Sequence, residues 1–235
     1  MKTMIVSDFA ILRSALFQLA GICLVIGAFM GWAMGSVAGA AAAIAAMVPF
    51  MMLFSLAATD EQNGWDRFRL TLPLTRRQVV WGRYASLGLI ILGTITFAAL
   101  VAFAFLAVAA GLQDGMLPAG LAPAENPPAA IVGAIVGAAC VISVGMDVAL
   151  PLIMRFGMTK ATRIVPAIVV VALAFGVAFF DAGGIPVASG LTGLIQWLDT
   201  GNNYLFAAAA IIVAAALLYA ASATIAAKLY EQREF

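Results

Sequence analysis

The chain has 235 residues, of which 65% are hydrophobic and only 10% are charged, with a formal net charge of +1. A water-soluble protein of this length could not hide so much apolar surface, so the composition indicates a protein whose main solvent is the lipid bilayer. The chain has no long basic tract, which argues against nucleic acid as a partner. It also has no histidine, which removes the commonest metal ligand and general base, so no metal site is expected.

Residues 1–13 mix polar and apolar side chains, which predicts a short interfacial helix on the cytoplasmic surface. Six apolar stretches follow, each about as long as the roughly 20 residues that a membrane-spanning helix needs. No alternating barrel pattern is visible, so the predicted fold is an all-α membrane protein with a single transmembrane domain over 1–235. The predicted spans are 14–33, 37–58, 85–112, 129–153, 164–181 and 204–227, and the first two should form a tight hairpin.

All twelve Lys and Arg residues fall on one side of this six-span topology. Because basic residues near span ends stay cytoplasmic during insertion, both termini are predicted to lie in the cytoplasm. Five of the twelve crowd into the single stretch between the second and third spans, and this stretch is the first place to look for function. They are Arg67, Arg69, Arg76, Arg77 and Arg83.

Glycines recur at four-residue spacing in two of the spans. Gly27 and Gly31 form such a pair in the first span, and Gly133 and Gly137 form another in the fourth. Small residues at this spacing allow a second helix to come close. Packing within one subunit is the favoured interpretation, and a contact between subunits is the alternative.

Cys23 and Cys140 both lie in apolar runs, which is typical of small buried hydrophobic residues.

Residues 59–84 form a cytoplasmic elbow with two predicted helix starts. Thr59 is followed by Gln62, and Thr75 is followed by Gln78, and both pairs have the spacing of a capping box. The turn Leu-Pro-Leu at 72–74 should end the first of these helices, because the residue before a proline disfavours helical torsion angles.

One face of the first elbow helix is predicted to be apolar. Trp65, Phe68 and Leu72 share that face, at relative positions i, i+3 and i+7. Such a helix could anchor the chain at the membrane surface or dock a second protein. Docking better explains why the segment contains two predicted helix starts with a turn between them. A membrane anchor does not need a turn of defined geometry.

The elbow resembles that of the ABC-2 type permeases. The run 72–80 reads Leu-Pro-Leu-Thr-Arg-Arg-Gln-Val-Val, and it follows an acidic segment with Trp65, as in the short six-span bacterial subgroup of that family. A second match is the run 150–161, Leu-Pro-Leu-Ile-Met-Arg-Phe-Gly-Met-Thr-Lys-Ala, at the predicted cytoplasmic end of the fourth span. The residues of this second motif that we single out are Pro151, Arg155, Gly157 and Lys160.

The resemblance implies a permease subunit of an ATP-driven exporter in the bacterial inner membrane. In such proteins the elbow is a coupling helix that sits in a cleft of a separate ATPase subunit, which binds ATP and Mg²⁺, and two permease subunits pair as a homodimer or heterodimer. The subgroup is often associated with export of peptides or protection against membrane-active peptides. The coupling role would fall to Trp65, Phe68, Leu72, Pro73, Thr75 and Arg76.

Asp147 is the one ionisable residue well within a predicted span. Carboxylates inside membranes are rare and usually face the bundle interior or water. The structural interpretation pairs Asp147 with Arg155, Arg163 or Arg13, or bonds it to Ser143. The functional interpretation makes it a contact for cationic cargo, or a latch that rearranges during transport.

Three other classes of function compete with the exporter. An ion-coupled transporter or channel would use Asp147, although such proteins usually place several polar residues in the membrane. An enzyme would need a nucleophile, base or metal site, and the sequence offers no such constellation. A scaffold that recruits an ATPase without moving cargo would use the same elbow.

Overall fold

The computed structural model describes residues 2–65, 75–111, 118–159 and 203–232, and all regular structure within these ranges is helical. Five long helices carry the fold, and two 3-10 turns precede the fourth of them. The long helices are α1 (Lys2–Met34), α2 (Val37–Gln62), α4 (Arg76–Ala110), α5 (Pro128–Phe156) and α8 (Asn203–Glu231), and the 3-10 turns are η1 (Ala119–Leu121) and η2 (Pro123–Glu125).

All five long helices are long and apolar enough to cross a membrane. They correspond to the first four and the last of the predicted spans, so these five predictions are confirmed. The predicted span 164–181 lies outside the described residues, and the count of six spans and the cytoplasmic orientation stay predictions. The all-α prediction is confirmed for the part of the chain that the structure describes.

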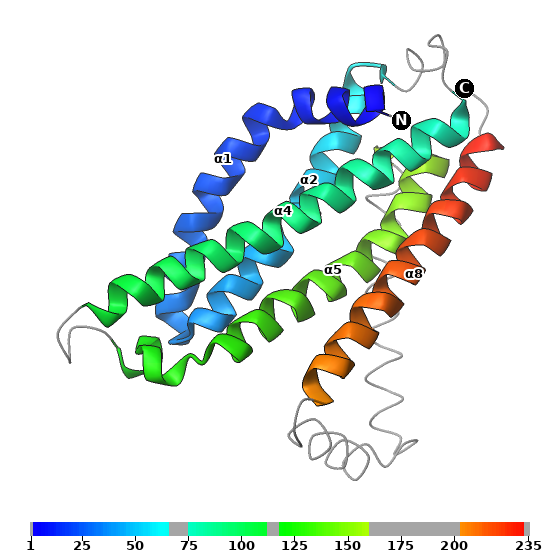
Figure 1. Ribbon diagram of the computed structural model, residues 1–235. Helices are drawn as coiled ribbons and strands as arrows, with labels where there is room; N and C mark the ends of the chain where they lie inside the picture. The colour runs from blue at the N-terminus through cyan, green and yellow to red at the C-terminus, as the bar shows by residue number, and fades with distance from the viewer. Residues whose placement is uncertain (1, 66–74, 112–117, 160–202, 233–235) are drawn as a thin grey trace, which may run out of the picture.

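Helix α2 lies at the centre of the bundle, where it contacts α1, α4 and α5. Helix α8 packs against α4 and α5. The start of α1, the end of α2, the start of α4 and the ends of α5 and α8 gather at one end of the molecule (Figure 1). This end carries Arg76, Arg77, Arg83 and Arg155, and we call it the basic end.

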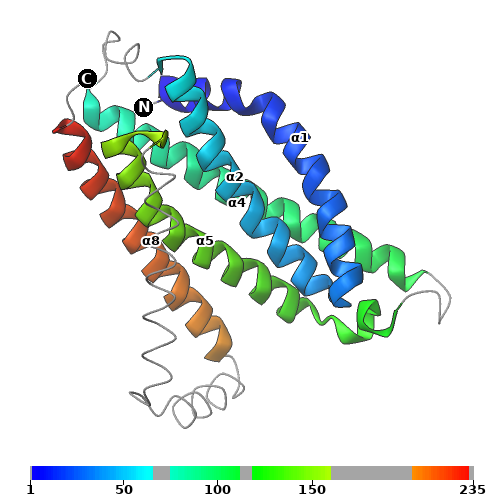
Figure 2. The ribbon, with the colours of Figure 1, turned by 180° about the vertical axis from the view of Figure 1, so that it is seen from behind.

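Helix α8 meets the bundle only near the basic end. Figures 1 and 2 both show α8 running beside α5 there and diverging from it toward the other end. Burial follows the same division, because Ala223, Ala226, Ala227 and Tyr230 are buried whereas Ile211 to Val213 are exposed. The first half of α8 therefore makes little contact with the other described helices.

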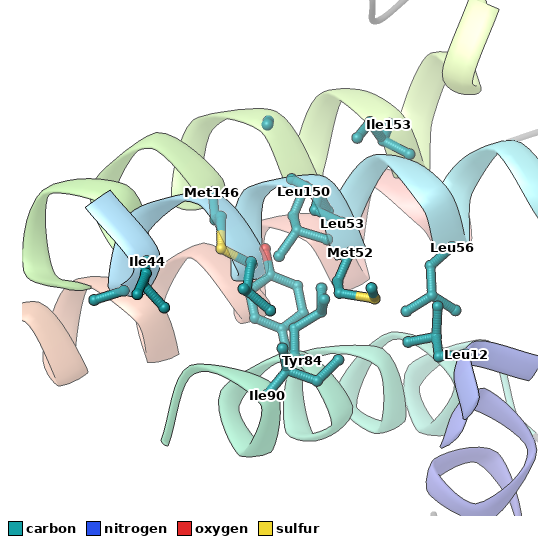
Figure 3. Packing of buried hydrophobic residues seen from close by; sticks show 14 of the residues in the cluster. Leu12, Ile44, Met52, Leu53, Leu56, Tyr84, Ile90, Met146, Leu150 and Ile153 are labelled. Carbon is teal, nitrogen blue, oxygen red and sulfur yellow. The ribbon is translucent and has the colours of Figure 1, made fainter. Parts of the chain in front are cut away.

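The core lies between α2, α4 and α5, mostly toward the basic end. Leu53 of α2 lies beside Leu150 of α5 with Tyr84 of α4 beneath them, and Leu56 of α2 points toward Leu12 of α1 (Figure 3). Within a bilayer the surrounding lipid is as apolar as these side chains, so close packing contributes more to helix association than the hydrophobic effect does. The core accordingly consists of interlocking side chains contributed by several helices.

The predicted hairpin between the first two spans is present. Helix α1 ends at Met34, Gly35 adopts a left-handed conformation with φ +61°, and the Ser36 side chain caps α2 by accepting a hydrogen bond from the Gly39 amide at 3.1 Å. A Cβ atom at Gly31 would come within 3.1 Å of the Ala40 methyl group, and one at Gly27 would meet the Ile44 side chain. Gly27 and Gly31 therefore pack against α2 of the same chain, which confirms the prediction of packing within one subunit.

The second glycine pair behaves differently. A Cβ atom at Gly133 or Gly137 would meet nothing within 4 Å, and both positions are exposed. These glycines therefore pack against no other described helix, in contrast to Gly27 and Gly31.

Asn126 holds the loop after α4 against this hairpin. Its side-chain oxygen accepts a hydrogen bond from the Val37 amide at 3.1 Å, and its side-chain nitrogen donates to the carbonyl oxygens of Gly120 at 2.8 Å and Ala122 at 3.0 Å. The Asn126 side chain is buried, so each bond satisfies a polar group that water cannot reach. The described part of the loop is thereby fixed to the start of α2.

The predicted helix start at Thr59 is wrong. Helix α2 continues through this position to Gln62, and the Thr59 hydroxyl donates to the Ser55 carbonyl oxygen at 2.8 Å instead of capping a new helix. The break comes four residues later, at Asn63 and Gly64, where Gly64 has φ +66°. A capping-box spacing is also compatible with a helix interior, because a Thr hydroxyl can bond the carbonyl one turn back.

Residues 2–13, predicted as an interfacial segment, form the first turns of α1. Met4, Asp8 and Leu12 recur every four residues and are all buried, so one face of this segment is covered by protein. Whether its other face lies at the membrane surface stays a prediction.

We expect Gly120→Ala to destabilise the fold, because a Cβ atom there would collide with the carbonyl oxygen of Gly35 in the hairpin turn. Neither backbone segment can move aside without breaking the bonds of Asn126, so the cost should be about 1–3 kcal/mol. Thermal unfolding in detergent measures it. Gly111→Ala is the matched control, since its nearest neighbour would lie at an ordinary 3.5 Å, and equal stability of the two variants would contradict the prediction.

Candidate functional site

A buried ion-pair cluster joins three helices at the basic end. Arg83 lies two turns into α4, and its side chain is only 3% exposed. One guanidinium nitrogen, Nη1, lies 3.3 Å from Oδ1 of Asp8 in α1, and Nη2 donates a hydrogen bond to Oδ2 of Asp60 in α2. Asp8 is fully buried, and the Asp60 side chain is 9% exposed. Arg83 is thus held between two carboxylates from different helices.

The cluster closes the two ends of the elbow. Asp60 lies near the start of the elbow, in the last turn of α2, and Arg83 lies near its end, in α4. A carboxylate at a helix C-terminus is unfavourable beside the negative end of the helix dipole. The Arg83 guanidinium offsets this, because it supplies a positive charge and a hydrogen bond where water is excluded.

Glu61, the next residue, makes a second connection in another direction. Its carboxylate accepts hydrogen bonds from the amide of Thr159, at 3.0 Å, and from the Thr159 hydroxyl. Thr159 follows Gly157, which ends α5 with φ +80°. Successive residues of a helix point about 100° apart, so the last turn of α2 reaches α4 with the Asp60 carboxylate and the end of α5 with the Glu61 carboxylate.

The end of α8 is bound by arginines from two helices. Arg76 in the first turn of α4 donates to the carbonyl oxygen of Glu231 at 2.7 Å, and Arg155 in the last turn of α5 donates to that of Leu229 at 3.4 Å. Arg155 also approaches the Gln232 side chain at 3.3 Å. Cations are favourable at a helix C-terminus, where carbonyl groups lack partners within the helix. Together with the Arg83 cluster and the Glu61 contact, these bonds form what we call the basic-end network.

The predicted coupling residues fall into two groups. Thr75 caps α4 in a complete capping box with Gln78, as predicted, and Arg76 contributes to the basic-end network. Trp65 is a half-buried helical residue directly after the Gly64 turn. Phe68, Leu72 and Pro73 lie outside the described residues, so the shape of the elbow's apolar face stays a prediction.

The motif at the end of the fourth span is mostly described. Pro151 is buried inside α5, Arg155 reaches α8, and Gly157 provides the left-handed residue that terminates the helix. Lys160 lies outside the described residues. The motif thus positions the end of α5 against both α8 and the Glu61 carboxylate.

Asp147 lies in α5, about two turns before Arg155 of the basic-end network, beside a group of side chains that carry hydroxyl groups. Its backbone carbonyl oxygen accepts a hydrogen bond from Ser222 of α8 at 2.7 Å, and the Ser222 and Tyr84 hydroxyls are also 2.7 Å apart. Tyr219 donates to the Tyr84 carbonyl oxygen at 2.8 Å, and the two rings pack edge to face. These bonds join α4, α5 and α8 within the apolar part of the bundle.

The Asp147 carboxylate itself is buried and has no hydrogen-bond partner among the described residues. The partners expected from the sequence are engaged elsewhere, since Arg155 bonds the end of α8 and the Ser143 hydroxyl donates to Ala139 at 2.7 Å. Those two expected contacts are therefore wrong, and Arg163 lies outside the described residues. In the same part of the chain no three His, Cys, Asp or Glu residues are grouped to hold a metal ion.

Sequence reasoning missed the Arg83 cluster. Arg83 was grouped with the other arginines of the elbow, and Asp8 with the mixed residues of the N-terminal segment. A signal was present, because Asp8 stands between Met4 and Leu12 at four-residue spacing on the face that becomes buried. A charged residue at an otherwise apolar helical position indicates a buried partner.

The fold and the basic-end network define a helical membrane protein whose described spans are held together at one end, beside the elbow. The chain belongs to the ABC-2 family of transporter proteins, because the family model described as "ABC-2 family transporter protein" matches it over residues 3–231. This match confirms the resemblance drawn from the elbow. No match was found among curated proteins or among solved structures.

We expect Arg83→Gln to destabilise the protein by about 3–5 kcal/mol, because it leaves two buried carboxylates without a counter-charge. Unfolding by detergent titration measures this loss. Arg77→Gln is the matched control, since its 4.0 Å pair with Glu231 is exposed and should contribute about 0–1 kcal/mol.

A compensated variant tests the cause. Combining Arg83→Gln with Asp8→Asn and Asp60→Asn removes all three charges, and we expect it to recover much of the lost stability. A triple variant no more stable than Arg83→Gln would show that packing of the arginine, not charge balance, holds the cluster together.

Proposed function

We propose that the chain is the membrane-spanning permease subunit of an ATP-driven exporter in a bacterial inner membrane. Membership of the ABC-2 transporter family supports the transport role. The chain carries no phosphate-binding Gly-Lys-Ser/Thr loop, so its energy comes from a separate ATPase subunit that binds ATP and Mg²⁺. A second permease subunit, identical or related, completes the pathway.

The observation that carries the proposal is the Asp60–Arg83 contact, which closes the base of the elbow. A force applied to an unconstrained loop would be lost in movement of the loop. Here Asp60 and Arg83, near the two ends of the elbow, are ion-paired with each other, and Arg83 is also paired with Asp8 of α1. The basic-end network links the elbow to α5 and α8 as well. A push on the elbow is therefore delivered to the helices as a unit.

The mechanism follows from this coupling. Closure of the ATPase subunits on ATP presses on the elbow, and the spans tilt as rigid bodies about the basic end. The half of α8 that diverges from α5 then moves furthest, because it lies far from the network and makes little contact with the other described helices (Figure 2). Tilting of this kind opens the pathway on the side away from the ATPase.

The cargo we propose is a peptide or another amphipathic molecule. Most of the large apolar side chains exposed on the described spans are Val, Leu, Ile and Phe, which suit an amphipathic solute better than a sugar. The absence of large polar surfaces in the described helices supports the same class.

The test is co-purification of the full chain with its ATPase. We expect Trp65→Ala and Arg76→Glu to reduce the amount of bound ATPase several-fold and to abolish ATP-dependent export, while the protein still inserts and remains folded. A stable complex unaffected by either change would contradict the coupling role.

Arg155→Gln separates a direct contact from an indirect one. Arg155 and Arg76 bind the same end of α8, but only Arg76 belongs to the elbow. If Arg76 contacts the ATPase, Arg155→Gln leaves association intact. If both variants lose the ATPase equally, Arg76 acts by holding α8, and it is a positioning residue within the permease.

A second candidate function is ion-coupled transport through Asp147, and the unpartnered carboxylate favours it. Under the exporter proposal Asp147→Asn should leave export dependent on ATP and insensitive to a protonophore. The measurement is uptake or export in vesicles with ATP or a proton gradient supplied separately. Transport driven by the gradient alone and lost in Asp147→Asn would replace the exporter with an ion-coupled transporter.

A further inference from the structure

Two apolar cavities follow one another along α1. The first, of about 680 Å³, is bordered by residues 9–20 of α1 and 89–97 of α4. The second, of about 460 Å³, is bordered by residues 24–32 of α1 and 101–105 of α4, and residues 37–44 of α2 also line it. Both lie on the side where α1 bows away from the other helices, as Figures 1 and 2 show. Together they make an apolar groove along α1.

The groove is about as long as the hydrocarbon core of a bilayer is thick. Arg13 borders it near the basic end and Trp32 borders it near the hairpin. At 1.5 Å per residue these two positions are about 28 Å apart along the helix, close to the roughly 30 Å thickness of a bilayer's hydrocarbon core. Arginine and tryptophan are both typical of the boundary between lipid tails and headgroups. The groove therefore runs in the direction of lipid chains, and its cavity nearer the basic end, bordered by residues 9–20, has about the length of an acyl chain in one leaflet.

The polar atoms of the groove point to the chemistry of its occupant. In the cavity nearer the basic end only Arg13 and Thr94 carry polar side chains, and the Thr94 hydroxyl already donates to the Ile90 carbonyl oxygen at 2.7 Å. The Arg13 side chain is exposed and makes no hydrogen bond or ion pair with the described residues. A matching occupant has one anionic group beside Arg13 and a long apolar part beyond it.

We propose that this groove binds an anionic phospholipid, with the headgroup phosphate at the Arg13 guanidinium and an acyl chain between α1 and α4. The basic end is predicted to face the cytoplasm, and the cytoplasmic leaflet is the one that carries anionic lipids. Guanidinium groups bind phosphate oxygens with charge-assisted hydrogen bonds. The proposal concerns a site on the outside of α1, and it does not depend on the exporter function.

Photo-crosslinking of the full chain in nanodiscs tests the site. The probe is phosphatidylglycerol with a photoactivatable group in one acyl chain, compared with a phosphatidylcholine probe of the same chain. Peptide mapping should locate the phosphatidylglycerol adducts in residues 9–20 and 89–97. Labelling should exceed that by phosphatidylcholine by roughly five-fold, the effect of one charge at the membrane surface.

Two substitutions separate the headgroup contact from the groove. Arg13→Gln should lower phosphatidylglycerol labelling to the phosphatidylcholine level, and Arg13→Lys should retain most of it. Gly93→Leu should reduce labelling by both probes, because Gly93 borders the cavity and a side chain there meets nothing within 4 Å. Gly133→Leu is the matched control, since it is equally open but lies on α5, away from the groove.

Three outcomes would overturn the proposal. Equal labelling of the wild-type chain by the two probes would show that no headgroup is selected. Labelling unchanged in both Arg13→Gln and Gly93→Leu would place the adducts elsewhere. Crosslinks between two copies of α1, with loss of lipid adducts in the dimer, would make the groove a subunit interface. If Arg13→Gln does not fold, the wild-type comparison and Gly93→Leu still decide.

Discussion

The buried guanidinium of Arg83 is the constraint on which the rest of the basic end depends. Moving an ionised group out of water costs several kcal/mol unless partners surround it, and the cost is not reduced by neighbouring lipid. Arg83 meets this requirement with Asp8 and Asp60, which come from the first and second helices. The three helices must therefore keep one relative position at that level, whatever the apolar side chains beyond it do. The position of the elbow, which begins and ends beside this cluster, follows from the same requirement.

The two ends of the bundle are held by different forces. At the basic end, charged and hydrogen-bonded groups connect α1, α2, α4, α5 and α8. At the other end the contacts are glycine and alanine packing in the α1–α2 hairpin and the bonds of Asn126. Helix α8 makes none of the contacts just named, and the buried residues among its described side chains begin at Ser222. Among the described helices, α8 is therefore held mainly at the basic end.

Local patterns in the sequence predicted local structure well. Apolar length located five helices, and the Thr75–Gln78 spacing predicted the start of α4. The Gly27–Gly31 spacing predicted close packing within the subunit, and α2 is the helix that packs there. The failures involve partners far apart in the sequence. Asp8 and Arg83 are separated by most of two spans, and no periodicity relates them. The Thr59 error has a local cause, because the same residues can cap a helix or sit inside one, and only Gly64 with its positive φ decides where the chain turns.

Asp147 and Arg83 show why burial alone does not identify a functional charge. Arg83 is deeply buried, but its ion pairs with Asp8 and Asp60 account for its burial, because they hold α1, α2 and α4 together. The Asp147 carboxylate is also shielded from solvent, but its neighbour Ser222 donates to the Asp147 backbone carbonyl oxygen and shares a hydrogen bond with Tyr84. The carboxylate oxygens have no hydrogen-bond partner among the described residues. A buried carboxylate without a hydrogen-bond partner opposes folding, so it does not contribute to the stability of the helix bundle. Of the two charges, Asp147 is therefore the one that the described residues leave without a counter-charge, whereas Arg83 is paired with carboxylates from two other helices.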